Sequence, residues 1–288
     1  MNARTSRADS LLLLTAMIWG VAFVAQRMGM AHLGPMGFNA VRFALGALVL
    51  LPAAVRRVGD SGAAPVGLLV GGGLAGVMVF SGASLQQMGL VYTTAGKAGF
   101  ITGLYVVIVP LLGRFVGQQA DRTAWLGASL AAVGLYLLSV NEAFHISFGD
   151  LLELAGAFFW ALHILVLGWL SPRMRAVRLA CAQFGVCAVL SAIAALGFET
   201  VTVSGVTGAA VPILYGGVIS VGVGYTLQVA AQRRTPSSHA AIILSLEAVF
   251  AALAGWAMLG ESLNGRELVG CVLMLAGMLV TQVAPLRK

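Results

Sequence analysis

The chain has 288 residues, of which 59% are apolar and only 9% are charged, with a formal net charge of +7. Soluble domains carry roughly 25% charged residues, so a soluble chain of this length would have too few to cover its surface. The composition therefore excludes a soluble enzyme, a disordered protein and an ordinary nucleic-acid binder. The 3 cysteines have neither the pattern of a disulfide framework nor the spacing of a zinc site, so we expect no metal and no cofactor.

The apolar residues form stretches that are long enough to cross a lipid bilayer. A spanning helix needs about 20 mostly apolar residues, and these runs are longer and more continuous than the alternating strands of a membrane barrel. Turn-forming or charged residues separate them, as at Gly34-Pro35 and Ser171-Pro172. We therefore predict an all-α polytopic membrane protein with ten transmembrane helices, over residues 10–31, 35–55, 65–90, 94–116, 122–140, 149–170, 177–198, 208–232, 236–259 and 265–284.

The positions of the basic residues indicate how these helices are oriented. The two chain ends and the even-numbered loops hold 13 of the 17 Lys and Arg residues, whereas the opposite loops hold mainly Asp and Glu, with Arg266 as their one basic residue. Loops rich in Lys and Arg stay on the cytoplasmic side of a membrane. We therefore predict that both termini are cytoplasmic, and nucleic acid is not needed to explain the net charge.

The two halves of the chain resemble each other. A shift of 142 residues places 93–140 on 235–282 without a gap, with identities such as Ala98 on Ala240 and Ile101 on Ile243. We predict two five-helix repeats, over residues 1–142 and 149–288. Because five is odd, the second repeat begins on the opposite side of the membrane, so the 5+5 repeats are inverted. Inverted repeats are typical of secondary transporters, which bind substrate in a central cavity near the membrane midplane.

Several short motifs resemble those of one transporter superfamily. They are Ile18-Trp19-Gly20, Val41-Arg42-Phe43, Leu244-Ser245-Leu246-Glu247 and Leu259-Gly260-Glu261-Ser262-Leu263. With them the chain resembles the drug/metabolite transporter superfamily, in its ten-helix EamA-type branch, and within it the YddG-type bacterial exporters of aromatic and other amino acids. The resemblance implies a multi-pass protein of the bacterial cytoplasmic (inner) membrane that moves a small molecule. Ala248 stands where many members have Pro, and Tyr105 and Gln119 replace the first-half counterparts of Glu247 and Glu261.

Polar groups inside the membrane are costly, and this makes them candidates for function. Arg42 and Asn39 lie three residues apart on one face of the second predicted helix. A guanidinium matches the geometry of a substrate carboxylate, although a structural role for Arg42 remains open. Glu247 is the only carboxylate that the pattern places deep in a span, and the repeat pairs it with Tyr105. It is a candidate to bind a substrate ammonium or a coupling proton, and the alternative is a structural hydrogen bond.

Aromatic residues form a second candidate group. Trp19 and Trp160 lie in the middle of repeat-related spans rather than in the interfacial belt where tryptophan usually lies. An aromatic wall suits an amphipathic solute and contacts an ammonium through the ring faces, while ordinary core packing is the alternative. Gln86 and Gln228 offer neutral hydrogen bonds to the same cavity or between helices. We expect the aromatic wall to contain Trp19, Tyr105, Phe158, Phe159, Trp160, His163 and Tyr225.

Four further charged or titratable residues lie near the ends of predicted helices. Lys97 and His239 are paired by the repeat, one near each membrane face. They are candidate gates, with snorkelling to the nearest interface as the alternative. Asp150 and Glu153 begin the sixth predicted helix, where we expect them to interact with the helix N-terminus.

Three transport functions fit these features, and we rank them. First is a monomeric secondary transporter that exports small amphipathic metabolites, most simply amino acids. Second is a multidrug exporter of organic cations, for which Glu247 would be the only central carboxylate. Third is a phosphate-ester or nucleotide-sugar exchanger, for which Arg42 and Lys97 are available but the other half offers only Gln183 and His239.

An intramembrane enzyme is not expected. Nucleophilic catalysis needs a nucleophile close to its base, and metal catalysis needs clustered ligands, yet the 4 histidines fall in separate segments. The sequence also has no phosphate-binding loop, so active pumping would depend on an ion gradient. Because the pattern predicts so few intramembrane carboxylates, it favours facilitated diffusion over ion coupling.

Overall fold

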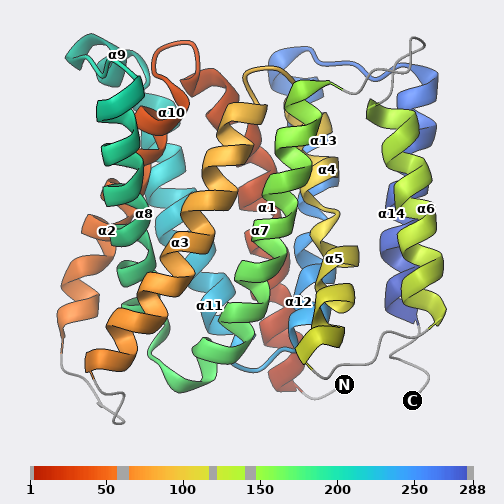
Figure 1. The fold of residues 1–288 in the computed structure, drawn as a ribbon, viewed down its shortest axis with the longest axis horizontal. Helices are drawn as coiled ribbons and strands as arrows, with labels where there is room; N and C mark the ends of the chain where they lie inside the picture. Colours follow the sequence, from red (N-terminus) through yellow and green to blue (C-terminus); the bar gives the residue numbers. More distant parts are fainter. Residues whose placement is uncertain (1–2, 57–64, 117–121, 140–146, 284–288) are drawn as a thin grey trace.

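The computed structural model describes residues 3–56, 65–116, 122–139 and 147–283, and all regular structure in these ranges is helical. Figure 1 shows the helices standing side by side, with both chain ends at the same end of the bundle. The elements are α1 (Ala3–Gly29), α2 (Pro35–Val55), α3 (Pro65–Gly89), α4 (Ala95–Thr102), α5 (Tyr105–Gly113), a 3-10 turn (Arg114–Val116), α6 (Arg122–Ser139), α7 (Phe148–Leu170), a 3-10 turn (Ser171–Arg173), α8 (Ala176–Phe198), α9 (Val203–Gly208), α10 (Ala210–Leu214), a π-helical stretch (Tyr215–Tyr225), α11 (Thr226–Gln232), α12 (Ser237–Leu244), α13 (Glu247–Leu259) and α14 (Gly265–Val283).

The helices confirm the predicted class of all-α polytopic membrane protein. Within the described ranges, 8 segments are long and apolar enough to cross a membrane. Helix α6 contributes a shorter apolar stretch, Ser129–Leu138, and α14 is not among the 8. The predicted number of ten spans therefore stays a prediction.

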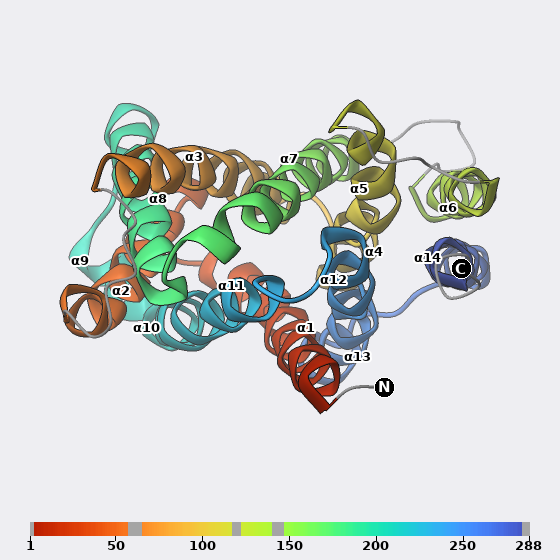
Figure 2. The same cartoon turned by 90° about the horizontal axis from the view of Figure 1, so that it is seen from below.

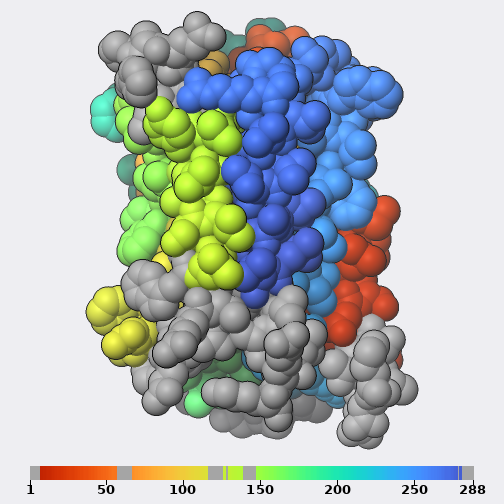
Figure 3. All heavy atoms as spheres, turned by 90° about the vertical axis from the view of Figure 1, so that its right-hand side faces the viewer, coloured from red at the N-terminus to blue at the C-terminus, as the bar shows by residue number. Residues whose placement is uncertain are grey.

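Helices α6 and α14 form a pair at one edge of the bundle. Figure 3 shows them lying along each other on that face, and Figure 2 shows the pair beside the main ring of helices. The backbones approach closely because glycine stands at the contacts. A side chain at Gly134 would meet the backbone oxygen of Gly270 at 2.6 Å, and one at Gly277 would meet that of Gly127 at 2.6 Å. Small residues commonly allow such close approach of membrane helices.

Two of the apolar segments are broken near their middle, at repeat-related positions. The backbone N–H of Gly103 bonds to Gly99 and that of Ser245 bonds to Ala241, in each case with the helix restarting two residues later. The α4–α5 and α12–α13 breaks therefore match across the shift of 142 residues found in the sequence. Broken helices of this kind place the first residue of the second half-helix at membrane depth. Those residues are Tyr105 and Glu247.

The Leu259–Leu263 motif has a clear structural role. Gly260 ends α13 in the left-handed conformation (φ 64°), which glycine adopts without strain. The chain then turns so that the Glu261 carboxylate accepts hydrogen bonds from the backbone N–H groups of Ala95 (2.9 Å) and Gly96 (3.0 Å) at the start of α4. Negative charge is favourable at a helix N-terminus, so the motif joins the two repeats at this face.

We expect Glu261→Ala to destabilise the protein by about 1–2 kcal/mol, the range for losing a helix cap. The N–H of the fully buried Ala95 would lose its acceptor, and the ion pair between Arg27 Nε and Glu261 Oε1 (3.5 Å) would be lost as well. Thermal unfolding of the purified protein in detergent measures the change. Glu261→Gln retains one acceptor oxygen and should lose less. Equal stability of Glu261→Ala and the wild type would contradict this role.

Candidate functional site

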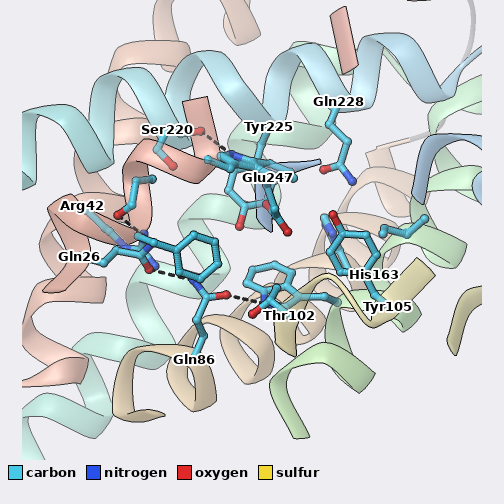
Figure 4. Close-up of a pocket in the computed structure, with 15 residues that line it drawn as sticks. Gln26, Arg42, Gln86, Thr102, Tyr105, His163, Ser220, Tyr225, Gln228 and Glu247 are labelled. Atoms are coloured by element: carbon cyan, nitrogen blue, oxygen red, sulfur yellow. Dashed lines mark hydrogen bonds between the residues drawn. The ribbon is translucent and has the colours of Figure 1, made fainter. Parts of the chain in front are cut away.

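A buried cavity of about 40 Å³ lies between the two halves of the chain. Figure 4 shows polar and aromatic side chains pointing into it from both repeats. The first half contributes α1, α2, α3, α4 and α5, and the second contributes α7, the π-helical stretch, α11 and α13. The lining residues are Trp19, Ala22, Phe23, Gln26, Arg42, Gln86, Thr102, Tyr105, Trp160, His163, Ile164, Ser220, Tyr225, Gln228 and Glu247.

Arg42 supplies a buried positive charge to this cavity and is only 3% exposed. Its Nε donates to Asn39 Oδ1 (2.9 Å), and Asn39 Nδ2 in turn donates to the Ala83 carbonyl (3.1 Å), which fixes the guanidinium in place. The guanidinium also lies 4.8 Å from the centre of the Phe43 ring. Among the described residues, no carboxylate forms an ion pair with Arg42. Its terminal nitrogens are therefore suited to an incoming anionic group.

Glu247 supplies a carboxyl group to the same cavity. It is 3% exposed and is the first residue of α13, so the broken helix places it at the cavity wall. The backbone of α1 comes close to this point because residue 20 is glycine, and a side chain there would meet the Glu247 carbonyl oxygen at 2.9 Å. This explains the glycine of the Ile18-Trp19-Gly20 motif. In the part of the chain that the structure describes, no basic side chain forms an ion pair with Glu247.

Aromatic side chains form a cluster at the wall of the cavity. Tyr225 is at the centre of this cluster, with its ring centroid 4.5 Å from that of Trp19 and 6.0 Å from those of Trp160 and His163. His163 Nε2 forms a hydrogen bond of 3.0 Å with Gln183 Oε1. The cavity therefore has an apolar wall that combines contributions from both repeats.

A chain of amide hydrogen bonds orders one side of the cavity. Trp160 Nε1 donates to Gln86 Oε1 (2.9 Å), and Gln86 Nε2 donates to Gln26 Oε1 (3.1 Å). Each amide is thereby held in a defined orientation. Gln228 differs, because its Oε1 is buried with no hydrogen-bond partner among the described residues. A buried acceptor without a donor is unfavourable, so Gln228 is available to a donor group of a bound solute.

The two cavity tryptophans each pack against a glycine, and these glycines are also related by the repeat. A side chain at Gly82 would meet the Trp160 ring at 3.0 Å, and one at Gly224 would meet Trp19 Nε1 at 2.7 Å. Gly82 and Gly224 are 142 residues apart. Each half therefore leaves space for the tryptophan that comes from the first helix of the other half.

We expect Gly224→Ala to destabilise the protein by about 1–3 kcal/mol, as overpacked cores do. The added methyl would displace Trp19 and weaken its hydrogen bond from Nε1 to the Ser220 carbonyl (3.2 Å). Gly185→Ala is the matched control, because a side chain at this helical glycine would meet nothing within 4 Å. Thermal unfolding should show a stable control and a weakened Gly224 variant. Similar midpoints for both variants would contradict the proposed clash.

The structure brings nine of the ten predicted binding residues to this cavity: Trp19, Arg42, Gln86, Tyr105, Trp160, His163, Tyr225, Gln228 and Glu247. Their role in binding stays a prediction. Asn39 does not line the cavity; its side chain instead accepts a hydrogen bond from Arg42 and so positions the guanidinium. Phe158 and Phe159 do not line it either, because they lie on other faces of α7 than Trp160, and Phe158 is 42% exposed.

Sequence reasoning did not identify several lining residues, among them Gln26, Thr102 and Ser220. Gln26 lies one helical turn from the end of α1, and Thr102 and Ser220 are small polar residues in apolar runs. The face of α1 was a usable signal for Gln26, since it lies seven residues after Trp19 and thus on the same side of the helix.

Asp150 lies in the first turn of α7, as the sequence predicts, but both Asp150 and Glu153 also bond to residues outside that helix. Both side chains are buried, 2% and 0% exposed, and neither caps α7, whose N-cap residue Ser147 makes no side-chain capping bond. Thr93 Oγ1 donates to Asp150 Oδ1 (2.8 Å), and Thr102 Oγ1 donates to Glu153 Oε2 (3.2 Å). Helix α3 covers them because Gly89 leaves room for Glu153. Glu247 is therefore not the only carboxylate deep in the bundle.

Comparison with known proteins identifies the family. The sequence profile of the EamA-like transporter family matches this chain twice, over residues 6–140 and 147–282. The chain belongs to the EamA-like transporter family. An uncharacterised transporter of Archaeoglobus fulgidus is 34% identical over 282 residues, covering 96% of this chain and 86% of that protein. A probable amino-acid metabolite efflux pump of Salmonella typhimurium is 27% identical over 295 residues, covering 96% and 95%.

A solved structure supports the fold of this EamA-like transporter. It superposes with a TM-score of 0.72 at 20% sequence identity, covering 98% of both chains. The predicted superfamily is thus confirmed, as is a multi-pass membrane protein that acts as a transporter.

The two predicted gate residues of the transporter each contact an acidic side chain, at opposite ends of the bundle. Lys97 Nζ lies 2.5 Å from Glu267 Oε1, and His239 Nε2 lies 3.0 Å from Asp9 Oδ1. Figure 1 shows α4 toward the end opposite the chain termini and α12 toward the end where they lie. Each contact joins a residue of the first repeat to one of the second, so breaking it would let the two repeats move apart at that end of the bundle. Gating by Lys97 and His239 remains a proposal.

A second, larger cavity of about 450 Å³ is lined by residues near the start of α1 and the end of α11. Its lining includes Arg7, Arg233 and Arg234. Ala231 lines this vestibule and Gln228, three residues earlier on α11, lines the central cavity. A single helical turn of α11 therefore lies between the arginine-rich vestibule and the central cavity.

Proposed function

We propose that this transporter exports small amphipathic metabolites, most simply amino acids, from the cytoplasm through the central cavity. One observation carries the proposal: a single cavity is lined by a guanidinium, Arg42, and a carboxylate, Glu247, and neither has an ion-pair partner among the described residues. Unpaired charges inside a membrane protein are expensive and are retained for function. A zwitterion would satisfy both of them at once.

The geometry favours a zwitterion over the two alternative substrate classes. An organic cation would pair with Glu247 and leave Arg42 buried without a partner. A phosphate ester would need several cations, yet Lys97 pairs with Glu267 at the end of the bundle and does not line the cavity. The aromatic residues Trp19, Trp160 and Tyr225 add an apolar surface for a substrate side chain.

Alternating access follows from the place of the cavity. It lies between the two halves of the chain, where movement of one repeat against the other would open it toward either side. The Lys97–Glu267 ion pair and the contact between Asp9 and His239 lie at opposite ends of the bundle. We infer that substrate enters when the cytoplasmic end opens, and that the inverted repeats then exchange roles to release it outside. Cytoplasmic termini and an inner-membrane location belong to this proposal.

Counterflow in liposomes tests the proposal. Purified protein is reconstituted with a high concentration of one unlabelled solute inside, and uptake of the same labelled solute is followed. The panel contains phenylalanine, leucine, tetraethylammonium and glucose 6-phosphate, with protein-free liposomes as the control. We expect counterflow of the amino acids alone. Transport of only the cation would favour a drug exporter, transport of only the phosphate ester would favour an exchanger, and either result would overturn the proposal.

A further inference from the structure

Asp150 and Glu153 form a second polar site beside the central cavity. They lie three residues apart on α7, so both side chains project from one face of that helix. The cluster is enclosed by α3, α4 and α7. Figure 1 shows α7 beginning at the end of the bundle opposite the chain termini, which is the outer side under the proposed orientation.

These two buried carboxyl groups have few hydrogen-bond partners. Each accepts one hydroxyl hydrogen bond, from Thr93 and Thr102 respectively. The remaining oxygens, Asp150 Oδ2 and Glu153 Oε1, are buried and have no hydrogen-bond partner among the described residues. An ionised carboxylate in such a place costs several kcal/mol unless a cation compensates it. A proton bound to either carboxyl group removes this penalty for that group.

No cation among the described residues forms an ion pair with Asp150 or Glu153. Arg27 on α1 bonds to the Thr93 carbonyl, while its ion pair goes to Glu261. Lys97 on α4 pairs with Glu267 on α14. In the described chain, neither residue forms an ion pair with the two carboxylates of α7.

Three further titratable side chains lie near the pair. Tyr92 lies beside the start of α7, where a side chain at Gly149 would meet it at 2.9 Å. Glu247 on α13 and Tyr105 on α5 face the same cavity as Thr102. A further negative charge at Glu247 adds to the repulsion within the group, so the cluster favours the uptake of a positive charge.

Thr102 connects this pair to the transport cavity. Its hydroxyl donates to Glu153 and the residue also lines the cavity that holds Glu247. A proton on Glu153 and a substrate ammonium at Glu247 both bring positive charge into one low-dielectric region, where like charges repel strongly. Each therefore weakens the binding of the other. Mutual displacement of this kind is the condition for exchange of one solute against the other.

We propose that Asp150 and Glu153 form a proton site that couples the entry of one proton from outside to the export of one substrate molecule. The proposal rests on the proposed transport function and revises the expectation of facilitated diffusion. A proton from external water binds the free oxygen of Glu153 or Asp150, and this displaces the substrate to the outside. When the cytoplasmic end of the bundle opens, the proton leaves to cytoplasmic water. A zwitterionic substrate has no net charge, so one positive charge moves inward per cycle.

Infrared spectroscopy tests the proton itself without any substrate. A protonated carboxylic acid has a carbonyl stretch that a carboxylate lacks. We expect this band in the purified wild-type protein at neutral pH, with a shift in heavy water. The intensity should fall in Glu153→Gln and in Asp150→Asn. Glu247→Gln identifies any contribution from the cavity carboxyl. An unchanged band in both α7 variants would overturn the proton site.

Transport assays test the coupling. Liposomes that contain the protein are loaded with labelled phenylalanine, and net efflux is compared with phenylalanine exchange. Acidifying the outside by one pH unit should sustain an about tenfold substrate gradient in the wild type, the ratio for one proton per substrate. Glu153→Gln and Asp150→Asn should keep exchange but lose this response. Glu199 follows α8, and its carboxylate accepts hydrogen bonds from the first backbone N–H groups of α2. Glu199→Gln makes the same carboxyl-to-amide change away from the pair, so it is the matched control and should keep the response.

The outcomes separate the two proposals. Exchange in the wild type with net efflux that ignores pH would overturn proton coupling and leave the transport function intact. A response to sodium instead of protons would overturn it in the same way. Absence of exchange for every amino acid would overturn the proposed function and the coupling that rests on it, while the infrared band would still decide whether Glu153 holds a proton.

Discussion

Arg42→Gln should abolish the preference of the cavity for solutes with a free carboxylate. Hydrogen bonds to a charged partner contribute about 1.5–3 kcal/mol, so the affinity for phenylalanine should fall by about 10–150-fold. Phenylalaninamide has no carboxylate, and its binding should change by less than about threefold. Arg42→Lys should be intermediate, because ammonium lacks the paired donors of guanidinium. Binding to the purified variants, measured by displacement of a labelled ligand, gives these ratios.

The Arg42 variants need a control for packing, because the guanidinium also stacks on Phe43 (4.8 Å) and Phe38 (5.6 Å). Asn39→Ala removes the hydrogen bond to Arg42 Nε but leaves the guanidinium and its charge. It should weaken phenylalanine binding less than Arg42→Gln does. An equal loss for phenylalanine and its amide in Arg42→Gln would mean that the residue supports the fold rather than the substrate.

Glu247→Gln should have the complementary effect. The variant keeps the size of the side chain and its place at the start of α13, but it removes the negative charge. Binding of phenylalanine should weaken by about 10–150-fold, because its ammonium loses a charged partner in a buried site. Binding of 3-phenylpropionate, which lacks the ammonium, should be maintained or improved.

The same variant distinguishes the rival functions. Unchanged transport of tetraethylammonium by Glu247→Gln would argue against any role for this carboxylate in cation binding. Unchanged binding of phenylalanine would contradict the proposed contact between this carboxylate and the substrate ammonium. Abundance and monodispersity of the purified protein show whether a loss arises from folding instead.

Much of the architecture could be predicted from the sequence, because apolar run length and repeat matching report directly on membrane helices. The pairing of Tyr105 with Glu247, and of Trp19 with Trp160, follows from the repeat and places all four side chains on one cavity. The breaks before Tyr105 and Glu247 were not predicted. Hydropathy is continuous across them, and the interruption depends on backbone hydrogen bonds that hydropathy does not detect.

The sequence was least informative where packing between helices decides the environment of a side chain. Glu153 follows the start of a helix, which favours a capping role, yet the contact with α3 at Gly89 buries it. Phe158 and Trp160 are two residues apart and equally apolar, but a helix turns about 100° per residue and only Trp160 faces the cavity.

The central claim is that one cavity recognises both charged ends of a zwitterion. The most direct measurement is competition for labelled phenylalanine on the purified wild-type protein by phenylalanine, phenylalaninamide and 3-phenylpropionate. These competitors share the aromatic ring and differ in the charged ends. We predict that only unlabelled phenylalanine displaces the label efficiently, with each single-charge analogue weaker by at least about tenfold. Equal displacement by either analogue would show that one of the two charges, Arg42 or Glu247, does not take part in recognition.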